Sequence, residues 1–266
     1  MRRVIIISRV DDVSMSVGDV LVESFGFRET GEGRFSRGKV ELVYIDEKHI
    51  FAEEIGERLK ADLVIVPSSH RSEKGVQAFL THPVGNWTED SSYGGRPRQL
   101  SATSALMLRE SLKTLWEESN KLGIDDLDVR LEVTHHGPYT TVPIIFIEVG
   151  GSFEKIVSRR EIEVVAAASL KTAEIELHRI ENTAIGFGGG HYAPSFTKIV
   201  LEGDYLVGHM CPKYALPITL EQIKQAVERT YEKPRIALID WKGITSNNRK
   251  ELVSQLESLN LEIIKI

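Results

Sequence analysis

The chain has 266 residues, of which 41% are hydrophobic and 27% charged, and its formal net charge is −6. This length and apolar content exclude a disordered or fibrous protein. The single cysteine, Cys211, excludes an intramolecular disulfide and a multi-cysteine zinc finger. The apolar runs are far shorter than the roughly 20 residues of a membrane helix, and the acidic balance gives no overall basic field for DNA. We therefore expect a cytoplasmic protein with no membrane and no DNA partner.

Apolar patterning predicts that strands and helices alternate along the chain. Strands are expected at residues 3–10, 39–45, 61–67, 127–135, 143–149, 235–241 and 261–266, and helices at residues 13–24, 48–60, 101–121, 153–173, 219–231 and 247–259. Residues 196–201 and 205–209 are expected to form a hairpin. This order is typical of an α/β sandwich, and the hairpin favours a mixed sheet. No linker divides the chain, so we predict one domain over residues 1–266 with a loop-rich insertion at about residues 68–100.

Histidines suggest where a functional site lies. Five of the eight follow predicted strands or lie in turns: His70, His82, His135, His136 and His191. Histidine changes charge near neutral pH and is a common metal ligand, so a group of histidines at strand ends indicates a site. A single histidine is more often a packed or hydrogen-bonded residue, and we interpret His49 and His178 as ordinary surface or packing residues.

The pair His135-His136 ends the predicted strand at residues 127–135. Because neighbouring residues of a strand point to opposite faces, we expect one ring to line a pocket and the other to anchor the turn. Glu132 would share the polar face with His136. The following loop, with Thr140, is stiffened by prolines and suits a general base or a metal ligand. A purely structural turn is the alternative.

Two loops could contact a substrate. Gly188, Gly189 and Gly190 precede His191, and their backbone N–H groups could approach an oxyanion or a phosphate. Arg96 and Arg98 could contact an RNA backbone. A flexible connection and a solvated surface loop are the respective alternatives. Cys211 follows His209 closely, but a buried inert thiol is the better interpretation.

Several strings in this sequence resemble the archaeal and plant type of D-aminoacyl-tRNA deacylase. They are SSHRSEKGVQAFLTHPVGNW (68–87), LEVTHHGPYTTVP (131–143), IFIEVG (145–150), GFGGGHYAPSFT (186–197) and VGHMCPKYA (207–215). None is a generic motif, and together with their spacing they cover nearly the whole chain. The resemblance implies hydrolysis of the ester between a D-amino acid and the terminal ribose of tRNA. It also implies zinc, a monomer, and a three-layer α/β/α fold of the phosphorylase/hydrolase type.

The catalytic residues are then a chemical hypothesis on the matching positions. We expect His135, His136, His191 and Glu132 to act in catalysis, and Zn²⁺ to be held among His70, His82, His135 and His191. Substrate contacts are expected from Gly188, Gly189, Gly190, Arg96, Arg98 and Thr140. A peptidyl-tRNA or nucleoside hydrolase or phosphorylase of similar fold, and a non-catalytic RNA-binding module, are the alternative functions. The hypothesis requires that histidines far apart in the chain converge on one cleft.

Overall fold

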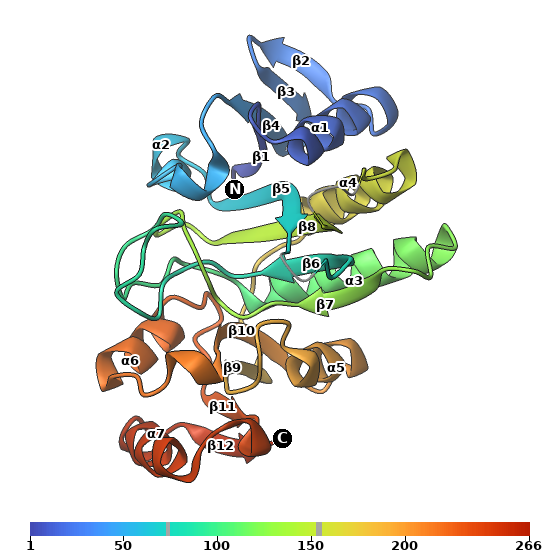
Figure 1. Ribbon diagram of the computed structural model, residues 1–266. Helices are drawn as coiled ribbons and strands as arrows, with labels where there is room; N and C mark the ends of the chain where they lie inside the picture. Colours follow the sequence, from blue (N-terminus) through green and yellow to red (C-terminus); the bar gives the residue numbers. More distant parts are fainter. Residues whose placement is uncertain (73–74, 153–155) are drawn as a thin grey trace.

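Two sheets organise the chain in the computed structural model, which describes residues 1–72, 75–152 and 156–266 (Figure 1). The larger is a mixed eight-stranded sheet in the order β2-β3-β4-β1-β5-β8-β6-β7, and the smaller is a parallel four-stranded sheet in the order β10-β9-β11-β12. The strands of the larger sheet are β1 (Arg3–Ser8), β2 (Arg28–Gly31), β3 (Arg34–Arg37), β4 (Val40–Ile45), β5 (Leu63–Arg71), β6 (Ala78–His82), β7 (Asp128–Leu131) and β8 (Ile144–Gly151). Those of the smaller sheet are β9 (Thr183–Phe187), β10 (Leu206–Cys211), β11 (Ile236–Ile239) and β12 (Glu262–Lys265).

Helices cover both sheets. They are α1 (Asp12–Ser24), α2 (Ile55–Arg58), α3 (Ala105–Lys121), α4 (Arg159–Glu174), α5 (Pro194–Glu202), α6 (Leu220–Glu228) and α7 (Ser246–Ser258), with short 3₁₀ turns η1 (His49–Phe51), η2 (Lys213–Ala215) and η3 (Trp241–Gly243). Several begin at residues that accept hydrogen bonds from the first turn, and Thr219 and Gln222 form a capping box at the start of α6.

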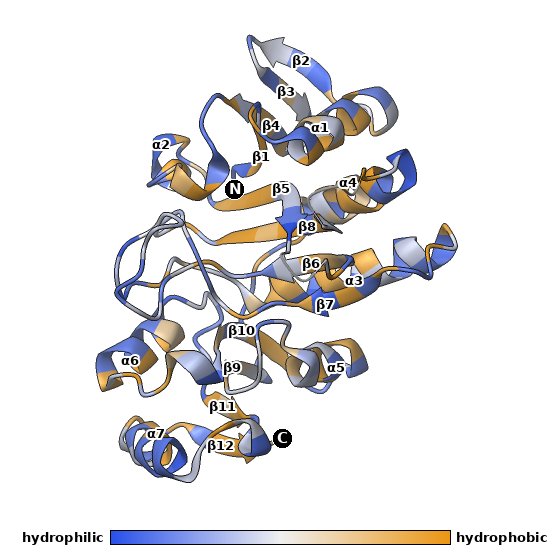
Figure 2. Ribbon diagram, in the orientation of Figure 1, coloured by the Kyte–Doolittle hydropathy of each residue, from blue (hydrophilic) through white to orange (hydrophobic). Residues whose placement is uncertain are grey.

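Alternation along the central strands divides the core. Ile5 and Ile7 of β1 pack in a cluster with α1, α3 and α4, whereas Val4 and Ile6 face the cluster that contains Ile55 of α2. The first cluster also includes Val207 and Leu238 of the smaller sheet. One apolar core therefore joins the two sheets. Figure 2 shows β5 apolar along its body and polar at its end.

The α/β class and the mixed sheet are confirmed, but several predicted elements are wrong. Residues 196–201 form helix α5 rather than a hairpin strand, because Phe196 and Val200, four residues apart, bury one helical face behind Pro194. β10 then runs parallel to β9, a strand that the pattern did not reveal. Residues 48–60 hold only η1 and α2. The predicted loop region contains the end of β5 and all of β6.

Other differences are smaller. The exposed strands β2 and β3 lack an apolar signal and were not expected. The helix predicted at 153–173 begins at Arg159, and residues 153–155 lie outside the described residues. Among the described residues, no helix combines the length and apolar character needed to cross a membrane. The single-domain organisation stays a prediction.

Candidate active site

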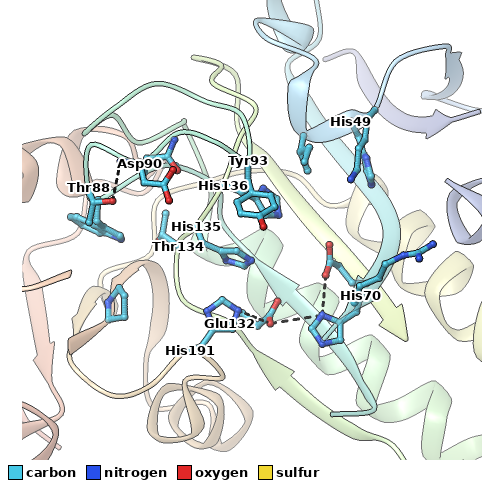
Figure 3. Close-up of a pocket in the computed structure, with 18 of the residues that line it drawn as sticks. His49, His70, Thr88, Asp90, Tyr93, Glu132, Thr134, His135, His136 and His191 are labelled. Carbon is cyan, nitrogen blue, oxygen red and sulfur yellow. Dashed lines mark hydrogen bonds and ion pairs between the residues drawn. The ribbon is translucent and has the colours of Figure 1, made fainter. Parts of the chain in front are cut away.

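A cavity of about 780 Å³ lies where the ends of several strands meet the loops of the smaller sheet. Four of the five predicted histidines line it, and the fifth, His82, lies behind the wall with its ring 4.2 Å from that of His135 between centroids. Figure 3 shows His135, His136, His191 and Glu132 in the middle of the cavity. The convergence that the sequence hypothesis required is therefore observed.

Strand pairing explains this convergence. His70 ends β5 and His82 ends β6, and both strands flank β8, which carries Glu148. In the register, Glu148 faces Ser68 of β5 and Leu80 of β6. The carboxylate is thus held between two strand ends that are 12 residues apart in the sequence.

Hydrogen bonds tie the chain beyond β7 to the smaller sheet. Val133 N–H donates to the His191 carbonyl at 3.0 Å, and Thr134 N–H donates to the Met210 carbonyl at 3.0 Å. These bonds bring the loop after β9 and the strand β10 against residues 132–136. Glu132, His135 and His191 consequently meet although they come from two sheets.

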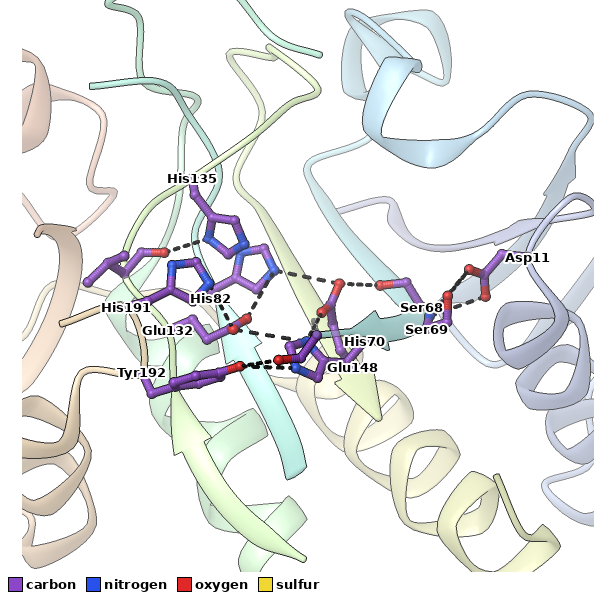
Figure 4. Close-up of polar contacts among 12 residues, drawn as sticks. Asp11, Ser68, Ser69, His70, His82, Glu132, His135, Glu148, His191 and Tyr192 are labelled. Atoms are coloured by element: carbon purple, nitrogen blue, oxygen red, sulfur yellow. Dashed lines mark hydrogen bonds and ion pairs between the residues drawn. The ribbon is translucent and has the colours of Figure 1, made fainter. Parts of the chain in front are cut away.

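Glu148 is a buried carboxylate that holds two histidines (Figure 4). Its oxygens lie 3.5 Å from His70 Nδ1 and 3.7 Å from His82 Nε2, and Ser68 Oγ donates to it at 2.7 Å. Burial alone would raise the pKa of Glu148, but the hydrogen bonds and charges of His70 and His82 hold it well below its usual range. Burial likewise would lower the pKa values of His70 and His82, and Glu148 with Glu132 instead raises them.

Glu132 is almost fully buried, and one of its oxygens lies 3.1 Å from His191 Nε2. His70 and His82 each approach it to 4.0 Å. Yet neither carboxylate oxygen accepts a hydrogen bond within the described part of the chain. A buried carboxylate in this state is costly to the fold unless a ligand, a metal or a water completes its shell.

Two of the histidines that line the cavity with Glu132 have lowered pKa values. Burial, together with the charges of His82, His136 and His191, holds the pKa of His135 well below its ordinary value. Burial and His82 lower the pKa of His136 to about 3. His135 Nδ1 lies 2.8 Å from the Val133 carbonyl, so this nitrogen is the donor and Nε2 keeps its lone pair. Neutral imidazoles with a free nitrogen can ligate a metal or accept a proton.

Within residues 1–72, 75–152 and 156–266, three overlapping groups of donor atoms could hold a metal ion, each with its atoms within 4.8 Å of one another. They are His82-His135-His136, Glu132-His135-His191 and His70-Glu132-Glu148. The four predicted ligands His70, His82, His135 and His191 are distributed over these groups rather than forming one. Glu132, which the sequence placed with His136, belongs to two of the groups and lies with His135 and His191.

Comparison with known proteins shows the family. Residues 57–264 match the family model described as D-aminoacyl-tRNA deacylase. The chain belongs to the D-aminoacyl-tRNA deacylase family. A curated D-aminoacyl-tRNA deacylase from Pyrococcus horikoshii is 35% identical over 99% of both chains, and one from Methanosarcina acetivorans is 36% identical over 92% of this chain and 82% of its own. The crystal structure of a conserved protein of unknown function is 28% identical, with a TM-score of 0.89 over 99% of this chain and 95% of its own.

Some residues that the deacylase resemblance suggested are not at the cavity. Gly188, Gly189 and Gly190 are not among its lining residues, and the Gly188 N–H already donates to the Cys211 carbonyl at 2.8 Å, so this amide does not serve an oxyanion. Thr140 is fully buried and its hydroxyl donates to Glu57 at 2.6 Å. These residues shape the loops beside the site.

The two arginines also lie outside the lining. Arg96 donates to Glu54 at 2.6 Å and lies over the Tyr139 ring, and Arg98 donates to Glu89 at 2.6 Å. Both ion pairs are exposed, so they resemble the solvated surface loop that was the alternative interpretation.

The adjacent histidines correct a second expectation. β7 ends at Leu131 and His136 has a φ of +42°, so the alternation of a strand does not extend to His135-His136. Both rings therefore line the cavity. The turn requires glycine at position 137, because a Cβ there would stand 2.1 Å from the Gly95 nitrogen.

Sequence reasoning missed two residues of this site. His49, interpreted as a surface or packing residue, is 4% exposed and lines the cavity. Glu148 was not considered, although a single carboxylate within the apolar run IIFIEV was a signal that could have revealed it. In contrast, Cys211 is buried and burial raises the pKa of its thiol well above the ordinary value, as expected of an inert cysteine. His178 is exposed.

Proposed function

We propose that this cavity is the active site at which the chain hydrolyses the ester between a D-amino acid and the 3′-terminal ribose of tRNA. The products are the free tRNA and the D-amino acid. The observation that carries the proposal is Glu132, a buried carboxylate without a hydrogen bond among the described residues, placed among histidines in a cavity large enough for an aminoacyl ester.

Ester hydrolysis needs a base for the attacking water and donors for the oxygen that becomes negatively charged. Glu132 suits the role of base through the oxygen that lies away from His191, because no described residue donates a hydrogen bond to it. His191 Nε2, 3.1 Å from Glu132, holds that carboxylate in place. His135 and His136 line the same space and are the candidates to contact the ester carbonyl.

Zinc fits the donor set of this site. Imidazole nitrogens and carboxylate oxygens are zinc ligands, and Glu132 with His135 and His191 offers three of them from partly and fully buried side chains. One oxygen of Glu132 would bind the metal, and the other would keep the role of base. When bound, zinc would lower the pKa of a coordinated water to about 7. We propose Glu132, His135 and His191 as the ligands of that ion, with His70 and His82 nearby.

The tRNA end has an entrance lined by aromatic side chains. Tyr93 and Tyr214 line the cavity and are 67% and 62% exposed, and the buried Trp87 forms the wall behind them. Aromatic rings at a mouth can stack an unpaired base such as the terminal nucleotide. We propose that the nucleotide lies on this side. The monomeric state, the cytoplasmic location and the lack of a DNA partner stay predictions.

The decisive experiment compares substrates on the purified protein. We expect single-turnover hydrolysis of a D-aminoacyl-tRNA and much slower hydrolysis of its L-counterpart, with His135→Ala and His191→Ala each slowing the first reaction by at least about 100-fold. Release of peptide from peptidyl-tRNA, or glycosidic cleavage of a nucleoside, with no action on the D-ester would favour the alternative hydrolases. Binding of tRNA without turnover would indicate an RNA-binding module.

A separate measurement tests zinc. Metal analysis of the purified protein should find about one zinc ion per chain, and a Glu132→Gln, His191→Ala double variant should lose it. Retention of zinc by the double variant would refute this ligand set, whereas protein active without any metal would refute the role of zinc but not the hydrolysis.

A further inference from the structure

The cavity has a second arm beside the histidine-lined middle. It is formed by the ends of β1 and β5 and by η1, and its walls include Asp11, His49 and Ser69. In Figure 3, His49 and His70 lie on one side of the central histidines, and Thr88 and Asp90 lie on the opposite side. Nothing in the hydrolysis described above uses this arm.

His49 is a buried polar residue without a partner. Its ring stacks on Phe146, with 5.3 Å between centroids and 29° between planes, and neither ring nitrogen has a hydrogen bond within the described residues. The residue lines the cavity while only 4% exposed. A buried imidazole in this condition is an open hydrogen-bonding position for something that enters the cavity.

Asp11 supplies a negative charge to the same arm. Its carboxylate caps α1 by accepting from Ser14 N–H at 2.8 Å, and Ser69 donates to it through Oγ at 2.5 Å and through N–H at 3.2 Å. Ser69 N–H also approaches Oδ2 at 3.4 Å, so three donors share the roughly four lone-pair positions of the carboxylate and one position stays open. Burial lowers the pKa of His49, and the charges of Asp11 and Glu148 act in the opposite direction. The arm therefore offers acceptors, and a cationic donor would match them.

An aminoacyl ester carries such a donor at a fixed place. Its α-ammonium group is two bonds from the reacting carbonyl carbon, about 2.5 Å away. The group must therefore lie in a part of the cavity adjacent to the reacting centre. Among the described lining residues, Lys48 and Arg71 are the cations at this arm, and both are exposed, so water screens their charges more than that of the buried Asp11.

We propose that Asp11 and His49 bind the α-ammonium group of the D-aminoacyl substrate. This inference rests on the proposed function and adds a specificity-determining site to it. With the carbonyl held at the central histidines and the ammonium held here, the hydrogen atom and the side chain occupy the two remaining positions at Cα. The two enantiomers exchange these positions. The two anchors therefore fix where each enantiomer places its side chain, and a cavity wall beside one of the two positions then distinguishes D- from L-aminoacyl esters.

The test uses a substrate that lacks the ammonium. D-aminoacyl-tRNA and the matching D-2-hydroxyacyl-tRNA are compared with the wild-type protein, Asp11→Asn and His49→Phe. Asparagine caps a helix as well as aspartate, and phenylalanine keeps the ring that stacks on Phe146. Both variants should lower kcat/KM for the aminoacyl ester by about 10- to 100-fold, as expected for loss of a charge-assisted hydrogen bond. Both should change hydrolysis of the hydroxyacyl ester by less than about threefold.

Asp46→Asn is the matched control. Asp46 is exposed, pairs with Arg9 at 3.2 Å and is not a lining residue, so this variant should behave as wild type on both esters. Equal losses on both esters in Asp11→Asn and His49→Phe would show a structural role and overturn the inference. So would unchanged hydrolysis of the aminoacyl ester in both variants, or a wild-type protein that does not distinguish the two esters. Failure of the wild type on both esters would refute the proposed function itself, and the inference with it.

Discussion

Two groups of buried histidines differ in how their nitrogens are satisfied. His209, on β10 of the smaller sheet, is fully buried, with Nδ1 3.2 Å from the Thr134 hydroxyl and Nε2 3.0 Å from the Ser101 carbonyl. Around the cavity, neither nitrogen of His49 has a hydrogen bond within the described residues, and His82 Nε2 lies 3.7 Å from Glu148. These histidines are all buried, yet only His209 has a hydrogen-bond partner within the described residues for each of its ring nitrogens.

This difference separates architecture from function. A folded chain normally pairs its buried polar groups, so a fully bonded histidine such as His209 is explained by the fold alone. Glu132 and His49 are buried and have no hydrogen bond among the described residues, so each has unused capacity for a hydrogen bond or a metal contact from outside the chain. Burial alone does not distinguish His209 from Glu132 and His49. Their hydrogen bonds do, because only His209 is fully hydrogen-bonded within the part of the chain that the structure describes.

The strongest test of this comparison is Glu132→Gln. We expect kcat/KM for D-aminoacyl-tRNA to fall by at least about 100-fold, because the amide cannot accept a proton from water and is a poor metal ligand. The melting temperature should not fall, because the substitution removes a buried charge that has no hydrogen bond. Glu202→Gln, at an exposed glutamate of α5, is the control for both measurements. Activity within about threefold of wild type would remove Glu132 from the reaction.

A second test compares stability directly. His209→Phe leaves the Thr134 hydroxyl and the Ser101 carbonyl without their partner, so we expect a loss of about 2–4 kcal/mol in the free energy of unfolding. His49→Phe removes no hydrogen bond and should change it by less than about 1 kcal/mol. Denaturant titration of both variants measures the two values. Equal losses would mean that the hydrogen bonds do not distinguish the two groups.

Part of this arrangement could be read from the sequence. His70, His82, His135, His136 and His191 were predicted to converge, because each follows a strand or lies in a turn and strand ends gather at the edge of a sheet. The strand positions at residues 3–10, 61–67 and 143–149 were recognised from their apolar runs and agree with β1, β5 and β8 except at their ends.

The rest depended on contacts that no local pattern contains. The Gly188 N–H donates to the Cys211 carbonyl, which lies 23 residues further along the sequence. The buried Thr140 hydroxyl donates to Glu57. His49 was misjudged because a pattern of helical spacing at residues 48–60 was taken as a helix, whereas the chain makes the 3₁₀ turn η1 there and the ring enters the cavity. Local periodicity gives the direction of a side chain only where the element is correct.

The satisfied histidine also predicts how stability depends on pH. Burial lowers the pKa of His209 to about 3 in the folded protein, against an ordinary value of 6.5. The unfolded chain therefore binds the proton first, and this contribution to stability is complete above pH 6.5 and is lost as the pH falls toward 3. His209→Asn cannot titrate, so between pH 6 and pH 4 the wild type should lose about 1.4 kcal/mol per pH unit more than the variant. His178→Asn, at an exposed histidine, should keep the wild-type slope.

The smallest expected effects are changes in KM on substitution of two exposed residues, Tyr214 and Arg98. Tyr214 lines the cavity and its hydroxyl lies 3.2 Å from His191 Nδ1, whereas Arg98 is outside the lining and paired with Glu89. If the terminal base of tRNA stacks at the aromatic entrance, Tyr214→Ala should raise KM about 10-fold and Tyr214→Phe should stay within about threefold, since the ring is kept. Arg98→Ala should change KM by less than about threefold, because an exposed ion pair contributes little and the guanidinium is already occupied. A larger effect at Arg98 than at Tyr214 would mean that the tRNA end approaches over the loop at residues 88–98, as the sequence had suggested, and not through the aromatic side of the cavity.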